Sequence, residues 1–497
     1  MKVGKLLESI SNLVVRDNIA DELKQLDVEY ITNNSTKVKP GTVFICRVGK
    51  NFDSHTIVEK LYNEGNVFAF VTEKEINPKI PYVQVYDSKL AEAYLADTFF
   101  EHPYNHLITF GVTGTNGKTT CAHLFHHIMQ QIGLTGSLSG TVMNDIMGDK
   151  FYIHNTTPDA ITIMENMAKT YKNGGSYYSM EVSSHSLDQA RVETIRFDIA
   201  GLTNITRDHL DYHPTFEHYA NAKMHIFDLL KKDGVAVITE DYFQLLNGRN
   251  VPKAVSIGTS DKADYRISNV STSWNGTVFS LKTPYGEKKV YTQMIGEYNA
   301  FNVTLVLAGL VEIGYDLDEI ISHISTFRGV DGRFEPIPEA RKLGIEVVID
   351  FAHSPDALEK VITTARKLTK GRLIVVYGAG GQADKGKRPM MSEVVTKLAD
   401  IAILTTDDPR GEDPEEIINE VETGVSPNSL SLTVLNRKEA IDTAITLATR
   451  GDVVMITGRG HEPYQTFSET LKIPFKDRDV TLDIILSKIN KNHNSRE

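Results

Sequence analysis

The segment 107–120 constrains the fold of this chain most, because it joins an apolar run to a glycine-rich loop and a helical pattern. Residues 107–112 are rich in β-branched and aromatic side chains, which predicts a buried strand. The loop that follows ends in Gly-Lys-Thr, and apolar residues then recur at helical spacing over 121–132. A strand, a glycine loop and a helix in this order are the setting that a phosphate-binding loop requires.

The loop and the start of the helix supply the candidate ATP ligands, which are Gly114, Thr115, Asn116, Gly117, Lys118, Thr119 and Thr120. Backbone N–H groups of such a loop converge on one small volume, and the helix dipole favours an anion there. Lys118 then places a cation on the outer phosphates, and the Thr119 hydroxyl can ligate Mg²⁺. The full pattern would need glycine where the chain has Val112, so a plain glycine turn with an exposed lysine is the alternative.

Composition limits the class of protein. A length of 497 residues predicts about three domains, and 41% hydrophobic with 24% charged residues is typical of a soluble globular protein. The net charge of -12 argues against a general nucleic-acid-binding surface. The two cysteines, Cys46 and Cys121, exclude a disulfide framework and lack metal spacing, so we expect a reducing cytoplasm. No apolar stretch approaches the length of a membrane span, so we expect no membrane partner.

Strand-like and helical patterns alternate along the chain, which predicts an α/β fold with parallel sheets. We expect a small α/β N-terminal domain over 1–105, a central P-loop-type ATPase domain over 106–335 and a Rossmann-like C-terminal domain over 336–497. Polar clusters follow several of the predicted strands, and in such sheets the chemistry gathers at the carboxyl ends of strands. The glycines at 378–381 lack the spacing of a dinucleotide-binding fingerprint, so we reject that site.

Glu181 and His209 are the candidate metal-site residues that follow strands of the central domain. Glu181 is a candidate direct or second-sphere Mg²⁺ ligand, and His209 can ligate metal or orient substrate. A helix N-cap or a satisfied loop side chain is the alternative for each, and the polar neighbours favour function. Asp208 and Asp211 fit either interpretation equally well.

Four residues further along have weaker local signals. Lys223 lies in a helical pattern, which by itself indicates a solvated lysine. A role beside Mg²⁺ would require that its charge be removed or inverted, because an ammonium would be repelled there. Asn302 lies in a predicted helix, and its side chain either contacts the edge of an adenine or faces water. Arg333, in the glycine-hinged segment 329–335, is placed to contact nucleotide phosphate or ribose, and Asp350 ends a predicted strand.

A set of motifs spread over nearly the whole chain resembles the Mur ligase family, and most closely its MurE-type members. The motifs are residues 114–119, 155–158, 181–185, 204–209, 329–335, 350–353, 387–389, 407–410 and 458–465. The resemblance implies an ATP- and Mg²⁺-dependent amide ligase of cytoplasmic peptidoglycan precursor synthesis. Such an enzyme adds a free diamino acid to the D-Glu of UDP-MurNAc-L-Ala-D-Glu through an acyl phosphate. We expect a monomer without nucleic-acid or membrane partners.

The resemblance also implies roles for individual residues. Lys223 corresponds to the carbamylated lysine of the family, whose anionic carbamate can bind a second Mg²⁺. The implied catalytic residues are Lys118, Glu181, His209 and Lys223, and the metal ligands are Thr119, Glu181, His209 and Lys223. The implied contacts to the UDP-substrate are Ser35, Thr156, Thr157, Ser183, Gln189 and Arg191, and those to the nucleotide include Asn302, Arg333 and Asp350. The implied contacts to the amino acid are Asp407, Asp408, Arg410, Gly458 and Glu462.

Departures from the family pattern leave the incoming amino acid open. Ala383 stands where the family has an arginine for the amino acid's carboxylate, unless Lys387 or Arg388 substitutes. Arg410 suits the distal carboxylate of meso-diaminopimelate, whereas Asp408 stands where diaminopimelate-adding members have asparagine and suits the distal ammonium of lysine. We place diaminopimelate slightly ahead of lysine.

Three alternatives compete with this interpretation. The first is a MurE-like paralogue that joins a different amino acid or uses a different carboxylate, as Ala383 suggests. The second, a folylpolyglutamate synthetase, is disfavoured by the additional N-terminal domain and by the 407–410 box. The third is a nucleotide-binding scaffold without catalysis, and the intact set of predicted catalytic residues argues against it.

Overall fold

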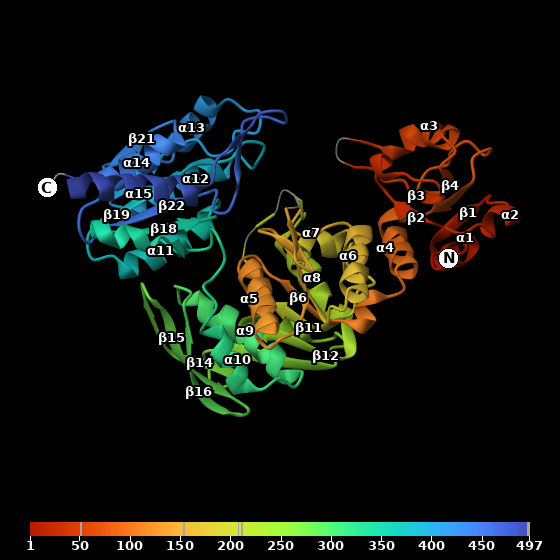
Figure 1. The fold of residues 1–497 in the computed structure, drawn as a ribbon, viewed down its shortest axis with the longest axis horizontal. Coiled ribbons are helices and arrows are strands. Elements are labelled where there is room, and N and C mark those ends of the chain that lie inside the picture. Colours follow the sequence, from red (N-terminus) through yellow and green to blue (C-terminus); the bar gives the residue numbers. More distant parts are fainter. Residues whose placement is uncertain (50–51, 153–154, 207, 210–211, 495–497) are drawn as a thin grey trace. The chain divides into compact units, whose positions relative to one another are not determined.

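The computed structural model describes residues 1–497 except 50–51, 153–154, 207, 210–211 and 495–497. The chain divides into two compact units, one of Met1–Arg266 with Thr304–His323 and one of Ile267–Val303 with Ile324–Glu497. Both units combine helices with mainly parallel sheets, which confirms the predicted α/β class (Figure 1). The predicted domain boundaries near residues 105 and 335 stay a prediction. Within the described residues, we find no helix with the length and apolar character needed to cross a membrane.

The N-terminal sheet has the strand order β1-β5-β4-β3-β2. Its strands are β1 (Val14–Asp17), β2 (Tyr30–Thr32), β3 (Thr42–Ile45), β4 (Val67–Thr72) and β5 (Tyr82–Val85). Strands β2 to β5 run parallel, and β1 pairs antiparallel with β5. The helices here are α1 (Val3–Glu8), α2 (Asp21–Lys24), α3 (Val58–Asn63) and α4 (Ser88–Phe99). The carboxyl ends of β2 and β3 therefore lie side by side at one edge of the sheet.

The central sheet has eleven strands in the order β16-β15-β14-β13-β12-β11-β6-β10-β7-β8-β9. Its first strands are β6 (Ile108–Thr113), β7 (Gly136–Ser139), β8 (Asn144–Ile146), β9 (Asp149–Phe151), β10 (Tyr177–Glu181) and β11 (Phe197–Leu202). The others are β12 (Leu230–Thr239), β13 (Lys253–Gly258), β14 (Tyr265–Ser273), β15 (Gly276–Thr283) and β16 (Gly286–Thr292). The predicted strand before the phosphate loop is β6, and it lies in the middle with β10 and β11 parallel on either side.

Helices pack onto this sheet by the apolar faces that the sequence predicts. They are α5 (Lys118–Gln131), α6 (Ala160–Lys172), α7 (Ser184–Asp188), α8 (Phe216–Met224), α9 (Tyr298–Glu312) and α10 (Leu317–Ile324). On α5 the side chains of Leu124, Phe125, Ile128 and Met129 are buried. The Phe125 ring stacks on Phe110 of β6 with 4.5 Å between ring centroids. This contact anchors the phosphate loop at both of its ends.

The C-terminal sheet has six strands in the order β17-β18-β22-β19-β20-β21. They are β17 (Glu335–Pro336), β18 (Glu346–Asp350), β19 (Leu373–Tyr377), β20 (Ile401–Leu404), β21 (Ser431–Thr433) and β22 (Val453–Thr457). The helices are α11 (Pro355–Leu368), α12 (Lys387–Leu398), α13 (Pro414–Glu422), α14 (Arg437–Leu447) and α15 (Asp477–Asn494), and β23 (Tyr464–Thr466) with β24 (Lys472–Pro474) forms a hairpin. Apolar clusters cover both faces of the sheet, as its continuous apolar strands predict.

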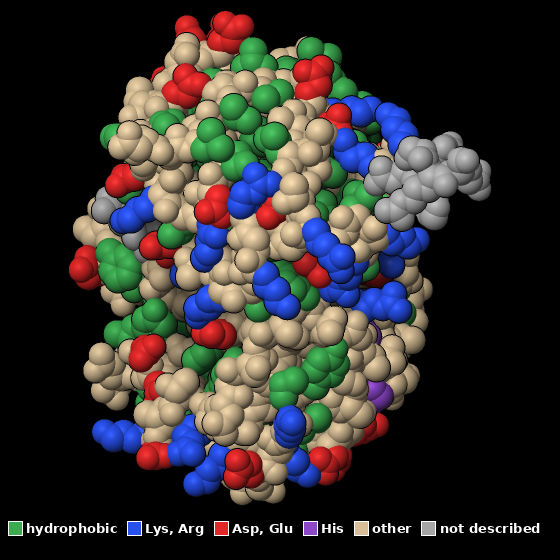
Figure 2. Space-filling model, turned by 90° about the vertical axis from the view of Figure 1, so that its left-hand side faces the viewer, with side chains coloured by type: hydrophobic (Ala, Val, Ile, Leu, Met, Phe, Trp, Pro, Cys, Tyr) green, Lys and Arg blue, Asp and Glu red, His purple; other side chains and the backbone are tan. Residues whose placement is uncertain are grey.

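The strands that sequence patterns did not single out are mostly short or lie at sheet edges. Examples are β2, β9 and β21, each of three residues. Such strands carry too few residues to show a periodicity, and pairing with a neighbour defines them. Strands β15 and β16 pair antiparallel, and a tight turn joins them where Thr283 lies opposite Gly286. Figure 2 shows one face of the molecule, on which acidic, basic and apolar side chains are interspersed.

A fully buried ion pair joins α14 to α15 in the C-terminal sheet region. Arg437 Nε and Nη2 each donate to the Asp477 carboxylate at 2.7 Å, and both side chains are 0% exposed. Since removing one partner leaves the other charge buried alone, Arg437→Met should lower the free energy of unfolding by about 3–5 kcal/mol. Urea unfolding followed by circular dichroism measures this loss. The double variant Arg437→Met/Asp477→Leu should recover most of it, and equal losses in both variants would contradict this account.

Candidate active site

The predicted phosphate loop has the backbone that its glycines were expected to allow. Gly114 and Gly117 have positive φ angles of 145° and 92°, and Gly117 caps the N-terminus of α5. A Cβ on Gly114 would lie 1.9 Å from Thr203 Oγ1, so no other residue fits there. Lys118 Nζ folds back over the loop and donates to the Gly114 and Thr115 carbonyls at 2.8 and 3.0 Å. The lysine thereby holds its charge at the mouth of the loop.

The segment after β11 fixes the other side of the loop. Because β11 runs parallel to β6 with Leu202 opposite Thr113, the next residues lie beside the loop. Thr115 N donates to the Asn204 carbonyl at 2.8 Å, and Asn116 N donates to Asn204 Oδ1 at 3.0 Å. Asn204, which lies in a motif of the family resemblance, therefore holds the phosphate loop in place by hydrogen bonds.

Glu181 ends β10 next to the same loop and is 1% exposed. Its Oε2 accepts a hydrogen bond from Thr119 Oγ1 at 3.0 Å, and its Oε1 accepts one from Thr141 N at 2.7 Å. A Cβ on Gly140 would lie 2.4 Å from Glu181 Oε1, so that glycine leaves room for the carboxylate. Two oxygen donors about 3 Å apart suit neighbouring positions of the octahedral shell that Mg²⁺ requires, so Thr119 and Glu181 fit this metal. Thr141 was not found from the sequence, because only the close packing of β10 on β7 brings it here.

Lys223 lies on α8 and is 1% exposed, so the interpretation as a solvated lysine is wrong. Its Nζ donates to the Gly114 carbonyl at 2.8 Å and lies 4.5 Å from the centroid of the Tyr219 ring. Burial lowers the pKa of the amine well below its usual range, the charge of Lys118 lowers it further, and Asp208 opposes both. Burial and the neighbouring cation thus disfavour the charged form of the Lys223 amine beside the phosphate loop.

His209 lies in the same region of the unit. It has a positive φ of 53°, and its side chain is 47% exposed. Its ring lies 4.9 Å from that of His185, and its Nε2 lies 3.6 Å from Asp208 Oδ2. The structure places this histidine beside His185 and Asp208, and its role as a metal ligand stays a prediction. Asp211 lies outside the described residues.

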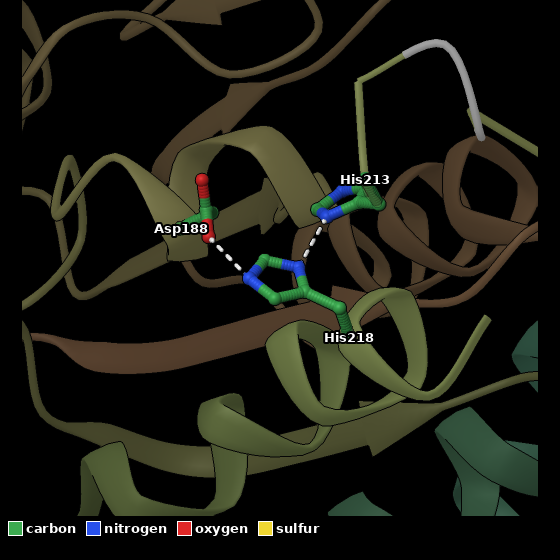
Figure 3. A group of neighbouring side chains, drawn as sticks. All are labelled: Asp188, His213 and His218. Atoms are coloured by element: carbon green, nitrogen blue, oxygen red, sulfur yellow. Dashed lines mark hydrogen bonds and ion pairs between the residues drawn. The ribbon is translucent and has the colours of Figure 1, made fainter. Parts of the chain in front are cut away.

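Asp188, His213 and His218 form a second polar group near this region (Figure 3), with one ligand atom of each within 4.8 Å of the others. His218 lies in the middle, with Nδ1 3.1 Å from His213 Nδ1 and Nε2 3.7 Å from Asp188 Oδ1. The two ring nitrogens of His218 therefore face different partners, and the three side chains form a polar chain. On the far side, His213 Nε2 contacts Ser184 Oγ at 3.0 Å, so this polar chain ends at the start of α7.

The predicted contacts to the muramoyl peptide come together by hydrogen bonds. Ser183 caps α7 and donates its N–H to Thr157 Oγ1 at 3.0 Å. Arg191 donates from Nη1 to the Thr157 carbonyl and from Nη2 to Gln189 Oε1, both at 2.8 Å. Thr156 precedes Thr157 and accepts a hydrogen bond from a neighbouring threonine at 3.0 Å. Ser35 instead follows β2 on the N-terminal sheet, at the start of a short turn that Asn34 caps.

The predicted nucleotide contacts Asn302, Arg333 and Asp350 lie in the other unit. Asn302 is buried on α9 and donates from Nδ2 to Asn299 Oδ1 at 3.0 Å. Asp350 ends β18 and accepts the N–H groups of Phe334 and Ala352, both at 2.7 Å. Burial raises the pKa of Asp350, and Arg333 opposes this shift. Asp350 therefore holds the backbone next to Arg333, whose guanidinium lies 4.6 Å from the centroid of the Phe351 ring.

The predicted amino-acid contacts gather at the carboxyl ends of β20 and β22. Asp407 and Asp408 follow β20, and Gly458 follows β22 with a φ of 109°. A Cβ on Gly458 would lie 2.2 Å from Asp407 Oδ2, so glycine is required for the two strand ends to approach. Glu462 follows in the next loop, and burial and then the charge of Asp408 raise the pKa of this carboxyl.

Asp408 pairs with Arg459, a residue to which the sequence analysis assigned no role. Arg459 is 1% exposed, donates to Asp408 Oδ1 and to the Tyr464 carbonyl, and so links three segments. Arg410 lies further out, with Nη2 3.8 Å from Asp408 Oδ2 and a side chain that is 45% exposed. Burial raises the pKa of Asp408 and the charge of Arg459 opposes this shift. The ion pair with Arg459 compensates the negative charge of this carboxylate.

Arg388 does not replace the arginine that the family has where this chain has Ala383. Its side chain is 0% exposed, and it donates to Glu420 at 2.5 Å, to Glu412 at 2.9 Å and to the Gly380 carbonyl at 3.2 Å. The guanidinium therefore holds α13 and the glycine loop together. The suggestion that Arg388 could substitute in substrate binding is not supported by these contacts.

Comparison with known proteins agrees with this geometry. Residues 112–310 match the Mur ligase middle domain, and residues 332–460 match the Mur ligase glutamate ligase domain. A Bacillus cereus protein named UDP-N-acetylmuramoyl-L-alanyl-D-glutamate--2,6-diaminopimelate ligase is 37% identical over 93% of this chain and 95% of its own length. A Listeria monocytogenes protein of the same name is 36% identical over 96% of this chain and 97% of its own length.

Solved structures show the same architecture. A structure of a UDP-N-acetylmuramoyl-L-alanyl-D-glutamate--2,6-diaminopimelate ligase aligns with a TM-score of 0.66 at 29% identity, over 94% of this chain and 98% of that one. The MurF ligase of Thermotoga maritima, solved with ADP, shares the fold with a TM-score of 0.61 at 20% identity, over 96% of this chain and 100% of that one. With both domain models and near-full-length relatives in agreement, this chain belongs to the Mur ligase family.

Proposed function

We propose that this chain is an ATP-dependent ligase that joins meso-diaminopimelate to the D-Glu of UDP-MurNAc-L-Ala-D-Glu in peptidoglycan precursor synthesis. The observation that carries the proposal is the convergence of Lys118, Glu181 and the buried Lys223 on one phosphate loop. Relatives with this activity in their names match nearly the whole chain. Because ATP and UDP-sugars are cytoplasmic metabolites, we place the reaction in the cytoplasm.

The reaction has two steps, and the residues act mainly by charge and position. The substrate carboxylate attacks the γ-phosphorus of ATP, the bond to ADP breaks, and an acyl phosphate forms. The amine of the amino acid then attacks the acyl carbon, loses a proton and displaces phosphate. Loop N–H groups and Lys118 stabilise the charge on the transferred phosphoryl group. Thr157, Ser183 and Arg191 hold the carboxylate end of the substrate in line.

Thr119 and Glu181 are the residues that would hold Mg²⁺, since their oxygens lie side by side. Held there, Mg²⁺ would supply positive charge against the phosphate oxygens. We propose His209 as a further ligand. Asn302, Arg333 and Asp350 are proposed to contact or position the nucleotide.

Lys223 is proposed to act as a carbamate. In its unprotonated form the amine can attack CO₂ and lose a proton, which leaves an N-carboxylate of one negative charge. The lowered pKa supports this step, because only the unprotonated amine is nucleophilic. The anion would sit beside Lys118, where a charged ammonium would be repelled.

The charges of the amino-acid site favour diaminopimelate over lysine. The charge of Asp408 is compensated by its ion pair with Arg459, so it does not cancel that of Arg410. Arg410 can then pair with the distal carboxylate that diaminopimelate has and lysine lacks. Ala383 supports a second candidate, a paralogue that uses a different amino acid, because no arginine stands at that position.

An amino-acid panel tests the proposal. The purified chain is incubated with ATP, Mg²⁺ and UDP-MurNAc-L-Ala-D-Glu, and each amino acid is supplied in turn. We expect ADP release that depends on the UDP-dipeptide and a product whose mass equals dipeptide plus diaminopimelate minus water. A product with another amino acid would establish the second candidate. ATP binding without any product would instead indicate a nucleotide-binding scaffold without catalysis.

Replacing Arg410 separates the two diamino acids. Arg410→Ala should lower kcat/KM for diaminopimelate about 10- to 100-fold, because a charge-assisted pair of about 1.5–3 kcal/mol is lost. Any turnover of lysine should change far less, since lysine has no distal carboxylate. Steady-state kinetics with both amino acids measure the difference. Equal losses for the two substrates, or a wild type that uses only lysine, would refute the assignment of Arg410.

A further inference from the structure

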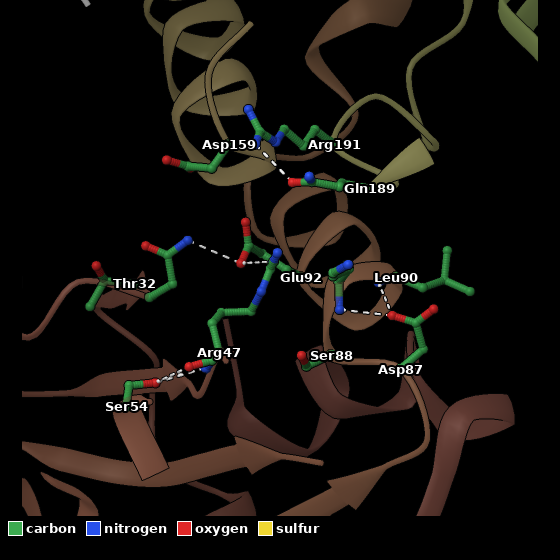
Figure 4. A network of polar contacts seen from close by, with 12 residues as sticks. Thr32, Arg47, Ser54, Asp87, Ser88, Leu90, Glu92, Asp159, Gln189 and Arg191 are labelled. Carbon is green, nitrogen blue, oxygen red and sulfur yellow. Dashed lines mark hydrogen bonds and ion pairs between the residues drawn. The ribbon is translucent and has the colours of Figure 1, made fainter. Parts of the chain in front are cut away.

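A buried carboxylate on α4, Glu92, receives two hydrogen bonds from the N-terminal sheet region (Figure 4). Its side chain is 1% exposed, and both bonds go to the same oxygen, Oε2. Arg47 donates from Nη1 at 2.7 Å, and Asn33 donates from Nδ2 at 3.0 Å. None of these three residues belongs to the motifs by which the chain resembles its family.

The two donors come from adjacent loops at one edge of a parallel sheet. Asn33 directly follows β2, and Arg47 lies two residues after β3, the strand beside it. In parallel sheets this carboxyl edge is where ligands bind. Asn33 is also two residues from Ser35, the proposed contact to the uridine side of the substrate. The Arg47 backbone is itself held, because its N–H donates to Ser54 Oγ at 2.7 Å.

Glu92 also faces the loop that leads to the muramoyl-peptide contacts. Helix α4 packs against α6, whose N-cap Asp159 comes just after Thr157. Arg47 and Glu92 form an ion pair, and the charges of Asp159, Arg47 and Glu92 all influence the pKa of Arg191, which Figure 4 shows in the same region. Burying a carboxylate costs solvation energy that an apolar side chain would not, so stability alone does not account for Glu92.

We propose that Glu92 is a positioning residue that fastens the two loops after β2 and β3 to α4 and so orders the site for the nucleotide end of the UDP-substrate. This inference rests on the proposed function. It assigns Glu92 no contact with substrate and no part in phosphoryl transfer. Loosening both loops should therefore weaken substrate binding and leave the chemical step intact.

Glu92→Leu and Glu92→Gln form a matched pair of tests. Leucine fills the buried space and accepts neither hydrogen bond, whereas the single amide oxygen of glutamine can accept both, because both bonds use one oxygen. For Glu92→Leu we expect KM for the UDP-dipeptide to rise about tenfold, with kcat within about twofold and KM for ATP unchanged. For Glu92→Gln we expect KM within about threefold of wild type. A purely structural role would move kcat and all KM values together.

Controls separate the possible outcomes. Glu75→Leu removes an exposed pair with Arg16 elsewhere on the N-terminal sheet and should change no kinetic constant. If Glu92→Leu fails to fold, Asn33→Ala removes one of the two bonds from a loop and should raise the same KM. Wild-type turnover with an unchanged KM in Glu92→Leu or Asn33→Ala overturns this inference alone. Wild type that neither binds nor turns over the UDP-dipeptide overturns the proposed function together with it.

Discussion

Lys118→Ala is expected to abolish ligation while the chain still folds. Lys118 starts α5 at a partly exposed position, and its Nζ donates to two loop carbonyls, at 2.8 and 3.0 Å. The side chain therefore contributes little to the core. Its charge is placed to neutralise phosphate oxygens, and losing one such group costs about 10²–10³-fold or more in kcat. ADP release that depends on the UDP-dipeptide, together with product mass, measures the loss.

The control for this variant is a lysine on the same sheet region that faces solvent. Lys172→Ala, at the exposed end of α6, should leave turnover unchanged. Circular dichroism and thermal unfolding should coincide for Lys118→Ala, Lys172→Ala and wild type. Normal turnover in a folded Lys118→Ala protein would remove the assignment of the ATP site.

Lys223→Ala is expected to be nearly inactive and to recover part of its activity when formate or acetate is added. The buried Lys223 site next to Gly114 would then be empty of its carbamate, and a small carboxylate can occupy the same space with the same charge. Turnover at increasing carboxylate concentration measures the recovery. Neither salt should stimulate the wild type or rescue Lys118→Ala, because in those proteins no anion is missing.

A direct observation complements the rescue. Wild type equilibrated with ¹³C-bicarbonate should show a carbamate signal by ¹³C nuclear magnetic resonance that Lys223→Ala lacks. A fully charged, unmodified Lys223 in the active enzyme would contradict the proposal. Loss of activity without rescue and without a carbamate signal would mean that Lys223 acts only as a hydrogen-bond donor to the Gly114 carbonyl.

The sequence by itself determined the features whose residues are contiguous. The strand β6, the glycine loop and α5 were predicted from one stretch because hydrophobic periodicity and backbone φ requirements act over a few neighbouring residues. The α/β class followed for the same reason, since strand and helix patterns alternate along the chain. The position of Asp350 at the end of β18 was also predicted correctly.

Local pattern was misleading for Lys223, whose neighbours indicate an exposed helix. Its burial comes from packing against a loop 109 residues earlier in the chain, which no local periodicity records. Only the resemblance to the family pointed to a role for it. The pKa shift that makes a carbamate chemically reasonable likewise arises from burial and from Lys118.

Tertiary structure alone decided the partners of the buried charges. Asp408 read as an added negative charge in the sequence, and it is compensated by Arg459, 51 positions away. No sequence pattern pointed to Glu92, and its carboxylate is bound by Arg47 from the loop after β3, 45 positions away. The physical reason is that the effect of a charge depends on solvent exposure and on the nearest opposite charge, and both are set by chain packing rather than by sequence neighbours.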